Sequence, residues 1–161
     1  MAEKTRTVIV TGAARGLGQA YGWAFARQGL NVVAADRDAL DQTMAGFAKP
    51  EDHLALPVDV ADFASVEAMV AATIEKYGGV DVLVNNAGAI NLARRETVDG
   101  IELTFALNHL SYFLLTHLLL DLLKSSAPAR IVNVSSSSHR KARINFDDLQ
   151  GRRGYRGMRA Y

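Results

Sequence analysis

The chain has 161 residues, a formal net charge of +1 and a hydrophobic content of 49%. This length predicts one domain, residues 1–161, with a substantial core, and the nearly balanced charge indicates no acidic partner. Because the chain has no cysteine, it has no disulfide, no thiolate metal site and no cysteine nucleophile. The N-terminal residues lack the apolar stretch of a signal peptide, so we expect a cytoplasmic location.

Short apolar segments alternate along the chain with longer segments of helical character. Strands rich in Val, Ile, Leu and Ala are expected at 7–11, 31–36, 53–58, 80–85 and 130–135, and helices at 16–28, 39–48, 63–77 and 98–124. Asp38 and Asp62 precede two of these helices as N-cap candidates. Strands that are apolar on both sides and separated by helices indicate a parallel sheet covered on both faces.

The longest apolar run extends over residues 110–123 and is interrupted by His117 and Asp121. A membrane span needs about 20 apolar residues. We therefore expect a buried helix here and no membrane span.

Three glycines, Gly12, Gly16 and Gly18, lie where the first strand turns into the first helix. Glycine permits positive φ and close approach of a ligand, and a helix N-terminus attracts a pyrophosphate through its free N–H groups. An ordinary strand–turn–helix connection with small residues for packing would have the same pattern.

An acidic residue at the end of the second strand supports the nucleotide interpretation. Asp36 lies eighteen residues after Gly18, close to the spacing of about 20 expected for a carboxylate that binds the adenosine ribose. A carboxylate at this position repels a 2′-phosphate and favours NAD over NADP. Arg37 is the opposing argument, because its guanidinium could hold that phosphate.

The spacing T-G-x-x-x-G-x-G resembles the fingerprint of the short-chain dehydrogenase/reductase family. Four further segments match that family in the same order: Asp59-Val60, the Asn85-Asn86-Ala87-Gly88 signature, Asn108, and the strand at 131–136. The resemblance implies a Rossmann-type doubly wound parallel sheet with strand order 3-2-1-4-5.

The same resemblance implies a set of site residues. The expected cofactor-binding residues are Thr11, Gly12, Ala14, Arg15, Gly16, Leu17, Gly18, Asp36, Arg37, Asp59, Val60, Asn86, Ala87 and Gly88. The expected catalytic residues are Asn108, Ser136 and Tyr161, with Ser136 preferred to Ser135 by register. The four histidines are scattered, and we expect no metal.

The segments 143–151 and 159–161 resemble the retinol-dehydrogenase-like branch of the family, in which Tyr161 would be the catalytic tyrosine. The alternative is a chance C-terminal aromatic residue. No residue follows Tyr161, so the family's lysine, its last two strands and its substrate loop are missing from this sequence. We therefore expect a dinucleotide-binding domain that is incomplete at its C-terminus, and a fragment that is inactive by itself.

These observations predict an NAD(P)-dependent oxidoreductase that transfers a hydride between nicotinamide and an alcohol or ketone, lipophilic or cyclic in character. A non-catalytic dinucleotide-binding module is the alternative if the chain ends at Tyr161. Arginine, glycine and tyrosine interleave over 151–157, as in some single-strand-binding segments. Because the net charge is only +1, we interpret this segment as a solvated loop, and expect a small-molecule substrate, no nucleic acid and a homo-oligomer for the full-length protein.

Overall fold

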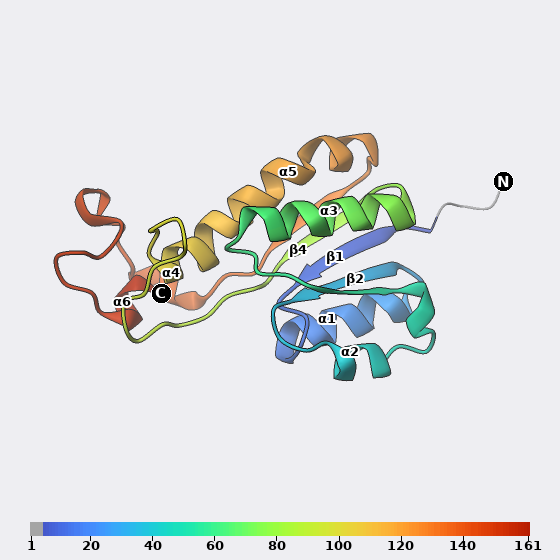
Figure 1. Ribbon diagram of the computed structural model, residues 1–161, viewed down its shortest axis with the longest axis horizontal. Coiled ribbons are helices and arrows are strands. Elements are labelled where there is room, and N and C mark those ends of the chain that lie inside the picture. Colours follow the sequence, from blue (N-terminus) through green and yellow to red (C-terminus); the bar gives the residue numbers. More distant parts are fainter. Residues whose placement is uncertain (1–4) are drawn as a thin grey trace.

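The computed structural model describes residues 5–161 and contains one five-stranded sheet (Figure 1). All four strand pairs are parallel, and the order is β3-β2-β1-β4-β5, which confirms the predicted topology. The strands are β1 (Thr7–Thr11), β2 (Asn31–Asp36), β3 (Leu54–Pro57), β4 (Val82–Asn85) and β5 (Arg130–Asn133).

Helices cover both faces of this sheet. They are α1 (Gly16–Arg27), α2 (Asp41–Ala45), α3 (Phe63–Tyr77), α4 (Leu103–Phe105), α5 (Ser111–Ser125) and α6 (Gly157–Ala160). A π-helical turn, Ala106–Leu110, joins α4 to α5, and 3-10 turns occupy Pro50–Asp52, Ser137–Lys141 and Phe146–Asp148. In Figure 1, α1 and α2 lie on one side of the sheet, and α3 and α5 on the other.

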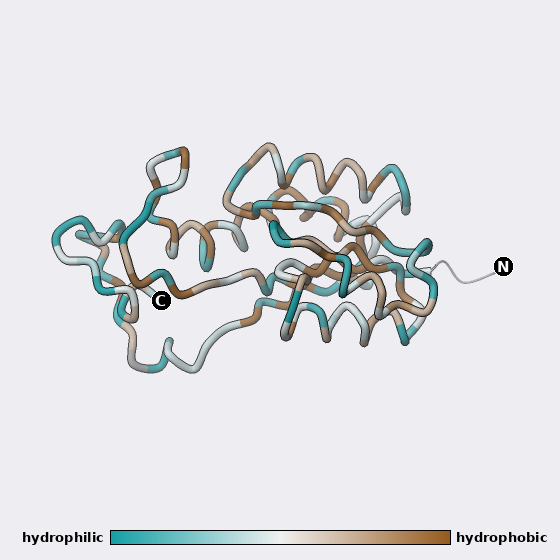
Figure 2. The backbone as a smooth tube through the Cα atoms, turned by 60° about the horizontal axis from the view of Figure 1, so that its bottom comes forward, coloured by the Kyte–Doolittle hydropathy of each residue, from teal (hydrophilic) through white to brown (hydrophobic). Residues whose placement is uncertain are grey.

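Alternating side chains of the central strand explain the two covered faces. Ile9 of β1 is fully buried in a cluster with Leu115 and Leu119 of α5, whereas its neighbours Val8 and Val10 are fully buried in a second cluster on the α1 face. The centre of a strand buried on both sides is apolar on both faces, which explains the apolar run Val8-Ile9-Val10 between Thr7 and Thr11. In Figure 2 the hydrophobic stretches gather in this strand region.

Helix boundaries follow local capping. Asp62 caps α3 as expected, because its side chain accepts a hydrogen bond from the Ser65 N–H, and Gly78 ends the helix at φ 74°. The expectation that Asp38 caps the second helix is wrong. The N-cap of α2 is Leu40, without a side-chain hydrogen bond, and the Asp38 carboxylate forms an ion pair instead.

Helix α2 is also shorter than the predicted 39–48. The indole of Trp23 packs against Gly46 so closely that a Cβ there would overlap the ring, and its Nε1–H donates to the Thr43 carbonyl at 2.9 Å. The indole thus occupies the space that the next turn of α2 would fill. The sequence pattern alone does not reveal this contact.

The long helix predicted at 98–124 begins later, because the Glu102 carboxylate accepts hydrogen bonds from the Thr104 and Phe105 N–H groups and caps the helix there. The helical run Leu103–Ser125 has 23 residues and is long and apolar enough to cross a membrane by length and composition. It packs on the sheet through Leu115, Leu119 and Leu123, but only 28% of its most apolar 18-residue window is buried, so the helix expected to be buried is buried along one face only. The expected absence of a membrane span stays a prediction.

Strand β5 forms one edge of the sheet, and all four of its residues are exposed. Figure 1 shows that the chain after β5 continues beyond the carboxyl ends of the strands, where α4 and α6 lie. In open α/β sheets this is the end at which ligands bind.

Candidate functional site

Thr11 at the end of β1 joins the glycine loop to the end of β4. Its Oγ1 accepts hydrogen bonds from the N–H groups of Asn86 and Ala87, both at 3.0 Å. In return, the Asn86 side-chain amide donates to the carbonyl oxygens of Thr11 at 2.9 Å and Gly12 at 3.3 Å. The glycine loop and the signature that contains Asn86 lie some 75 residues apart in sequence and are therefore joined by hydrogen bonds.

Glycine is required at two positions of this loop by close contacts. A Cβ on Gly18 would lie 2.7 Å from the carbonyl carbon of Gly12 and 2.7 Å from Asn86 Nδ2. A Cβ on Gly12 would lie 2.9 Å from Ala87 Cα, and Gly12 also has φ +67°. The loop can close against Asn86 only without these side chains.

Gly16 differs from the other two glycines, because its Cβ direction meets nothing within 4 Å. It has φ +58° and begins α1, whose N-cap residue Arg15 makes no side-chain capping hydrogen bond. The first N–H groups of this 12-residue helix thus remain open beside free space. Leu17 is 61% exposed next to it. Open donors at a helix N-terminus suit a phosphate group.

The Asp36 carboxylate connects the glycine loop with the loop that follows β2. One oxygen accepts from the Ala14 N–H at 2.9 Å, and the other accepts from the Asp38 N–H at 3.0 Å. Across the same gap, the Arg15 guanidinium lies 2.9 Å from the Asp38 carboxylate. The predicted ribose-binding carboxylate is therefore held in place by main-chain donors on both sides.

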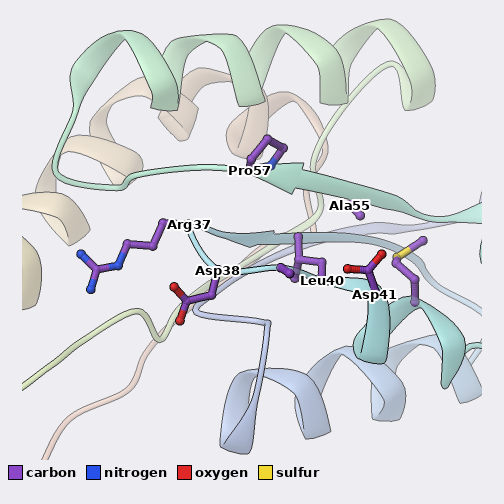
Figure 3. Close-up of a pocket in the computed structure, with 8 residues that line it drawn as sticks. Arg37, Asp38, Leu40, Asp41, Ala55 and Pro57 are labelled. Carbon is purple, nitrogen blue, oxygen red and sulfur yellow. The ribbon is translucent and has the colours of Figure 1, made fainter.

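A pocket of about 240 Å³ adjoins these residues (Figure 3). It is lined by Arg37, Asp38, Ala39, Leu40, Asp41, Met44, Ala55 and Pro57. Figure 3 shows Arg37 and Asp38 at one end of this pocket, with Asp41 at the other. The pocket lies between β3, helix α2 and the loop that follows β2, and Arg37, the residue after Asp36, is part of its lining.

The residues after β3 divide into an exposed and a buried one. The exposed Asp59 accepts a hydrogen bond from the Ala61 N–H, and its own N–H donates to Ser65 Oγ. Val60 is 4% exposed and belongs to the hydrophobic core. Its side chain is thus unavailable to a cofactor, and only its main chain could take the predicted binding role.

Asn108 lies in the π-helical turn and binds the loop after β4. Its Oδ1 accepts from the Ala89 N–H and its Nδ2 donates to the Ala89 carbonyl, each at 2.9 Å. A Cβ on Gly88 would lie 3.1 Å from Asn108 Oδ1, so the glycine permits this approach. The predicted catalytic asparagine thus fixes the course of the chain after Asn86.

A second pocket, of about 470 Å³, opens between α5 and the end of β5. Its lining consists of Asn108, His109, Tyr112, Phe113, Thr116, Asn133, Val134 and Ser135. Ser136 is the next residue and caps a 3-10 turn, accepting from the Ser138 N–H at 3.2 Å. Its assignment as the catalytic serine stays a prediction, with Ser135 on the pocket wall beside it.

Tyr112 and Tyr161 are two phenols in this region. The Tyr112 hydroxyl donates to the Val134 carbonyl at 3.3 Å. Burial, with a smaller contribution from the Tyr161 phenol, raises the pKa of Tyr112 to about 12. Tyr112 therefore stays protonated at neutral pH, whereas Tyr161 is 39% exposed. Tyr112 lines the second pocket, whereas Tyr161 is exposed to solvent and is not among the residues that line it.

The structure also shows contacts that the sequence did not predict, above all around Tyr155. Its hydroxyl donates to the Asn91 carbonyl at 2.7 Å and lies 3.0 Å from Thr104 Oγ1. The adjoining Gln150 accepts from the Glu102 N–H at 2.7 Å through its side chain. These contacts anchor the segment before Tyr161 to the loop between β4 and α4.

Asn85 was predicted only as part of a signature, yet it is fully buried. Its Nδ2 donates to Asn133 Oδ1 at 2.8 Å, which joins β4 to the edge strand β5 by a side-chain bond. Its Oδ1 has no hydrogen-bond partner within residues 5–161. In the same residues, no group of three His, Asp or Glu side chains could hold a metal ion.

Comparison with known proteins agrees with this arrangement. A sequence model of short chain dehydrogenases matches residues 6–147. The chain belongs to the short-chain dehydrogenase family. The five strands of the sheet and the glycine loop lie within the matched residues.

Individual relatives point to one branch of the family. The chain is 42% identical to human retinol dehydrogenase 13 over 162 residues, covering 97% of this chain and 49% of that protein. It is 38% identical to mouse retinol dehydrogenase 12 over 161 residues, covering 97% and 51%. The chain therefore spans about half the length of the curated relatives it matches.

Solved structures give the same fold. An uncharacterized protein from Mycobacterium paratuberculosis is 36% identical, with a TM-score of 0.79, over 97% of this chain and 56% of that one. A Caenorhabditis elegans short-chain dehydrogenase/reductase of unknown function, solved with cofactor, is 25% identical with a TM-score of 0.74, over 96% and 58%. Both comparisons confirm the Rossmann-type architecture.

Proposed function

We propose that this chain forms the cofactor-binding half of an NAD(P)-dependent oxidoreductase that transfers a hydride between nicotinamide and an alcohol or carbonyl carbon. The observation that carries the proposal is the connection between Thr11 and Asn86, which joins the glycine loop to the end of β4. In this arrangement the first N–H groups of α1, which no side chain caps, and the free space beside Gly16 are available to a pyrophosphate.

The preferred dinucleotide in this proposal is NAD. The Asp36 carboxylate is fixed at the end of β2 by two N–H donors and can accept hydrogen bonds from ribose hydroxyls. The same negative charge opposes a 2′-phosphate. Arg37 at the adjoining pocket is the residue that favours NADP.

Bound nicotinamide would supply or accept the hydride. In the proposed reaction, Tyr161 exchanges a proton with the substrate oxygen, and Ser136 donates a hydrogen bond to that oxygen. Asn108 serves by holding Ala89, and with it the chain after Asn86, in place.

A lipophilic or cyclic alcohol or ketone is the proposed substrate. The relatives named as retinol dehydrogenases support this choice. So does the surface near the second pocket, where Phe113, a lining residue, is 69% exposed. We expect a polypeptide ending at Tyr161 to bind the dinucleotide without measurable turnover, which corresponds to the alternative function of a binding module.

The test uses the purified 161-residue polypeptide. Titration with NADH and NADPH, followed by nicotinamide fluorescence, should show saturable binding that Asn86→Ala abolishes. Glu67→Gln, at an exposed position of α3, is the control and should bind as the parent does. Absence of saturable binding of either dinucleotide would contradict the proposed function, and oxidation of retinol or cyclohexanol by this polypeptide would contradict the inactivity of the fragment.

A further inference from the structure

We infer that Asp38 is a specificity-determining residue, which disfavours NADP by holding the Arg15 guanidinium in an ion pair. The inference rests on the proposed function, because it assumes that the dinucleotide binds along the glycine loop. It concerns the side chains of Arg15 and Asp38. Asp38 is part of neither the glycine motif nor a strand-end motif.

The main chain places these two residues opposite each other. Arg15 directly follows Ala14, whose N–H donates to one oxygen of Asp36 at 2.9 Å. Asp38 donates its own N–H to the other oxygen of Asp36 at 3.0 Å. The Asp36 carboxylate therefore brings the two loops together, and the Arg15 and Asp38 side chains meet at 2.9 Å.

This pairing decides how much positive charge is available to a ligand. A phosphate is bound most strongly by a guanidinium that offers two parallel N–H groups. Arg15 lies on the loop that contacts Asp36, so it is a cation within reach of a phosphate on the adenosine ribose. While the Arg15 guanidinium is paired with Asp38, a 2′-phosphate must first displace this carboxylate. A ribose 2′-hydroxyl carries no charge and meets no such opposition.

Arg37 offers a second guanidinium at this pocket, and among the described residues Asp38 pairs with Arg15 and not with Arg37. In Figure 3 its side chain extends outward from the end of the pocket at which Asp38 lies. Asp38 directly follows Arg37 in the chain, and its carboxylate pairs with Arg15. Its removal should release one guanidinium while leaving Asp36 and its two N–H donors unchanged.

Folding does not depend on this ion pair. The side chains of Arg15 and Asp38 are 83% and 43% exposed, and ion pairs at such positions contribute little to stability. Variants at these positions should therefore fold as the parent does, so that a change in dinucleotide affinity does not reflect a change in folding.

The experiment compares four variants of the 161-residue polypeptide, Asp38→Asn, Arg15→Gln, the double variant and Asp41→Asn, by fluorescence titration with NADH and NADPH. We expect Asp38→Asn to tighten NADPH binding up to about fivefold, the upper end for release from an exposed ion pair, and to change NADH binding less than about twofold. In the Arg15→Gln background the same substitution should have no more than about a twofold effect on NADPH.

Asp41→Asn is the matched control. Asp41 lines the same pocket at its other end, and the substitution removes the same charge. It should change the ratio of the two dissociation constants less than about threefold, because charges further apart in water are screened. Adenosine 2′,5′-bisphosphate, a probe without nicotinamide, should show the same gain of up to about fivefold in Asp38→Asn.

Three outcomes would overturn the inference. They are an unchanged NADPH affinity in Asp38→Asn, a gain that persists in the double variant, and an equal gain in Asp41→Asn. Failure of the parent polypeptide to bind either dinucleotide would refute the proposed function itself. Binding of NADH with an unaltered preference in Asp38→Asn would refute only the inference.

Discussion

Substitution of Gly18 by alanine tests whether the glycine loop is closed by packing against Asn86. The added Cβ would lie 2.7 Å from Asn86 Nδ2 and from the carbonyl carbon of Gly12, both below the 3.0 Å that Cβ contacts reach in proteins. Helix α1 must then move away from the loop. The Asn86 amide would lose its hydrogen bonds to the carbonyl oxygens of Thr11 and Gly12.

The expected cost follows from these contacts. Overfilling a packed site costs about 1–3 kcal/mol, and each lost hydrogen bond adds about 0.5–1.5 kcal/mol. We therefore expect Gly18→Ala to lower the free energy of unfolding by about 3 kcal/mol. For a domain of this size the corresponding decrease in Tm is about 6–12 °C.

The assay is thermal unfolding followed by circular dichroism, together with a urea titration at room temperature. Gly22→Ala is the matched control in the same helix, because its Cβ would meet Phe47 and Val32 at 3.7 Å and 3.8 Å, which are ordinary contacts. Because alanine favours a helix more than glycine does, Gly22→Ala should raise the free energy of unfolding by about 0.5–1 kcal/mol. Equal stability of Gly18→Ala and the parent, with NADH binding retained, would refute the reasoning about loop closure.

Three further perturbations address other contacts. Thr11→Val keeps the shape of the side chain but leaves two N–H groups without an acceptor, so it should cost about 2–4 kcal/mol in a urea titration. His53 accepts a hydrogen bond from the Val32 N–H through Nδ1 at 3.1 Å, and burial lowers its pKa below the usual value of 6.5. Its contribution to stability should be present above pH 6.5 and be lost as the pH falls toward its lower folded pKa, so Tm should decrease over that range. Tyr155→Phe removes the hydroxyl that donates to the Asn91 carbonyl, and trypsin should then cleave within 151–157 about five times faster.

Each of these has its own control. Thr11→Ser retains the hydroxyl and should recover most of the lost stability. His53→Ala should have a Tm that varies less between pH 7.5 and 5.5 than that of the parent, and an equal variation would contradict the role of this imidazole. Tyr21→Phe, on helix α1, should leave the cleavage rate within 151–157 unchanged. Cleavage of Tyr155→Phe at the parent rate would show that the hydroxyl does not anchor this segment.

Features defined by nearby residues could be predicted from the sequence. The three glycines, Asp36 and Asn86 were expected at strand ends, and the parallel topology brings them to the same edge of the sheet. The Asp62 cap was equally predictable, because its acceptor and donor are three residues apart.

Features that depend on contacts between distant segments could not be predicted in this way. Tyr155 meets Asn91 across 64 residues, and no local pattern marks either residue. Trp23 shortens α2 only because α1 and α2 pack on the same face. The ion pair that turns Asp38 away from helix capping likewise requires the glycine loop to be in place.

The π-helical turn at Ala106–Leu110 carries a consequence for insertions and deletions in this part of the chain. Such a turn holds one residue more than an α-helical turn would. Asn108 faces Ala89 while Leu115 faces the sheet. Loss of one residue between them would rotate these two side chains relative to each other by about 100°, the angle per residue of an α-helix. The spacing between the asparagine and the core leucine is therefore fixed in length, and homologous chains that keep both contacts should align here without gaps.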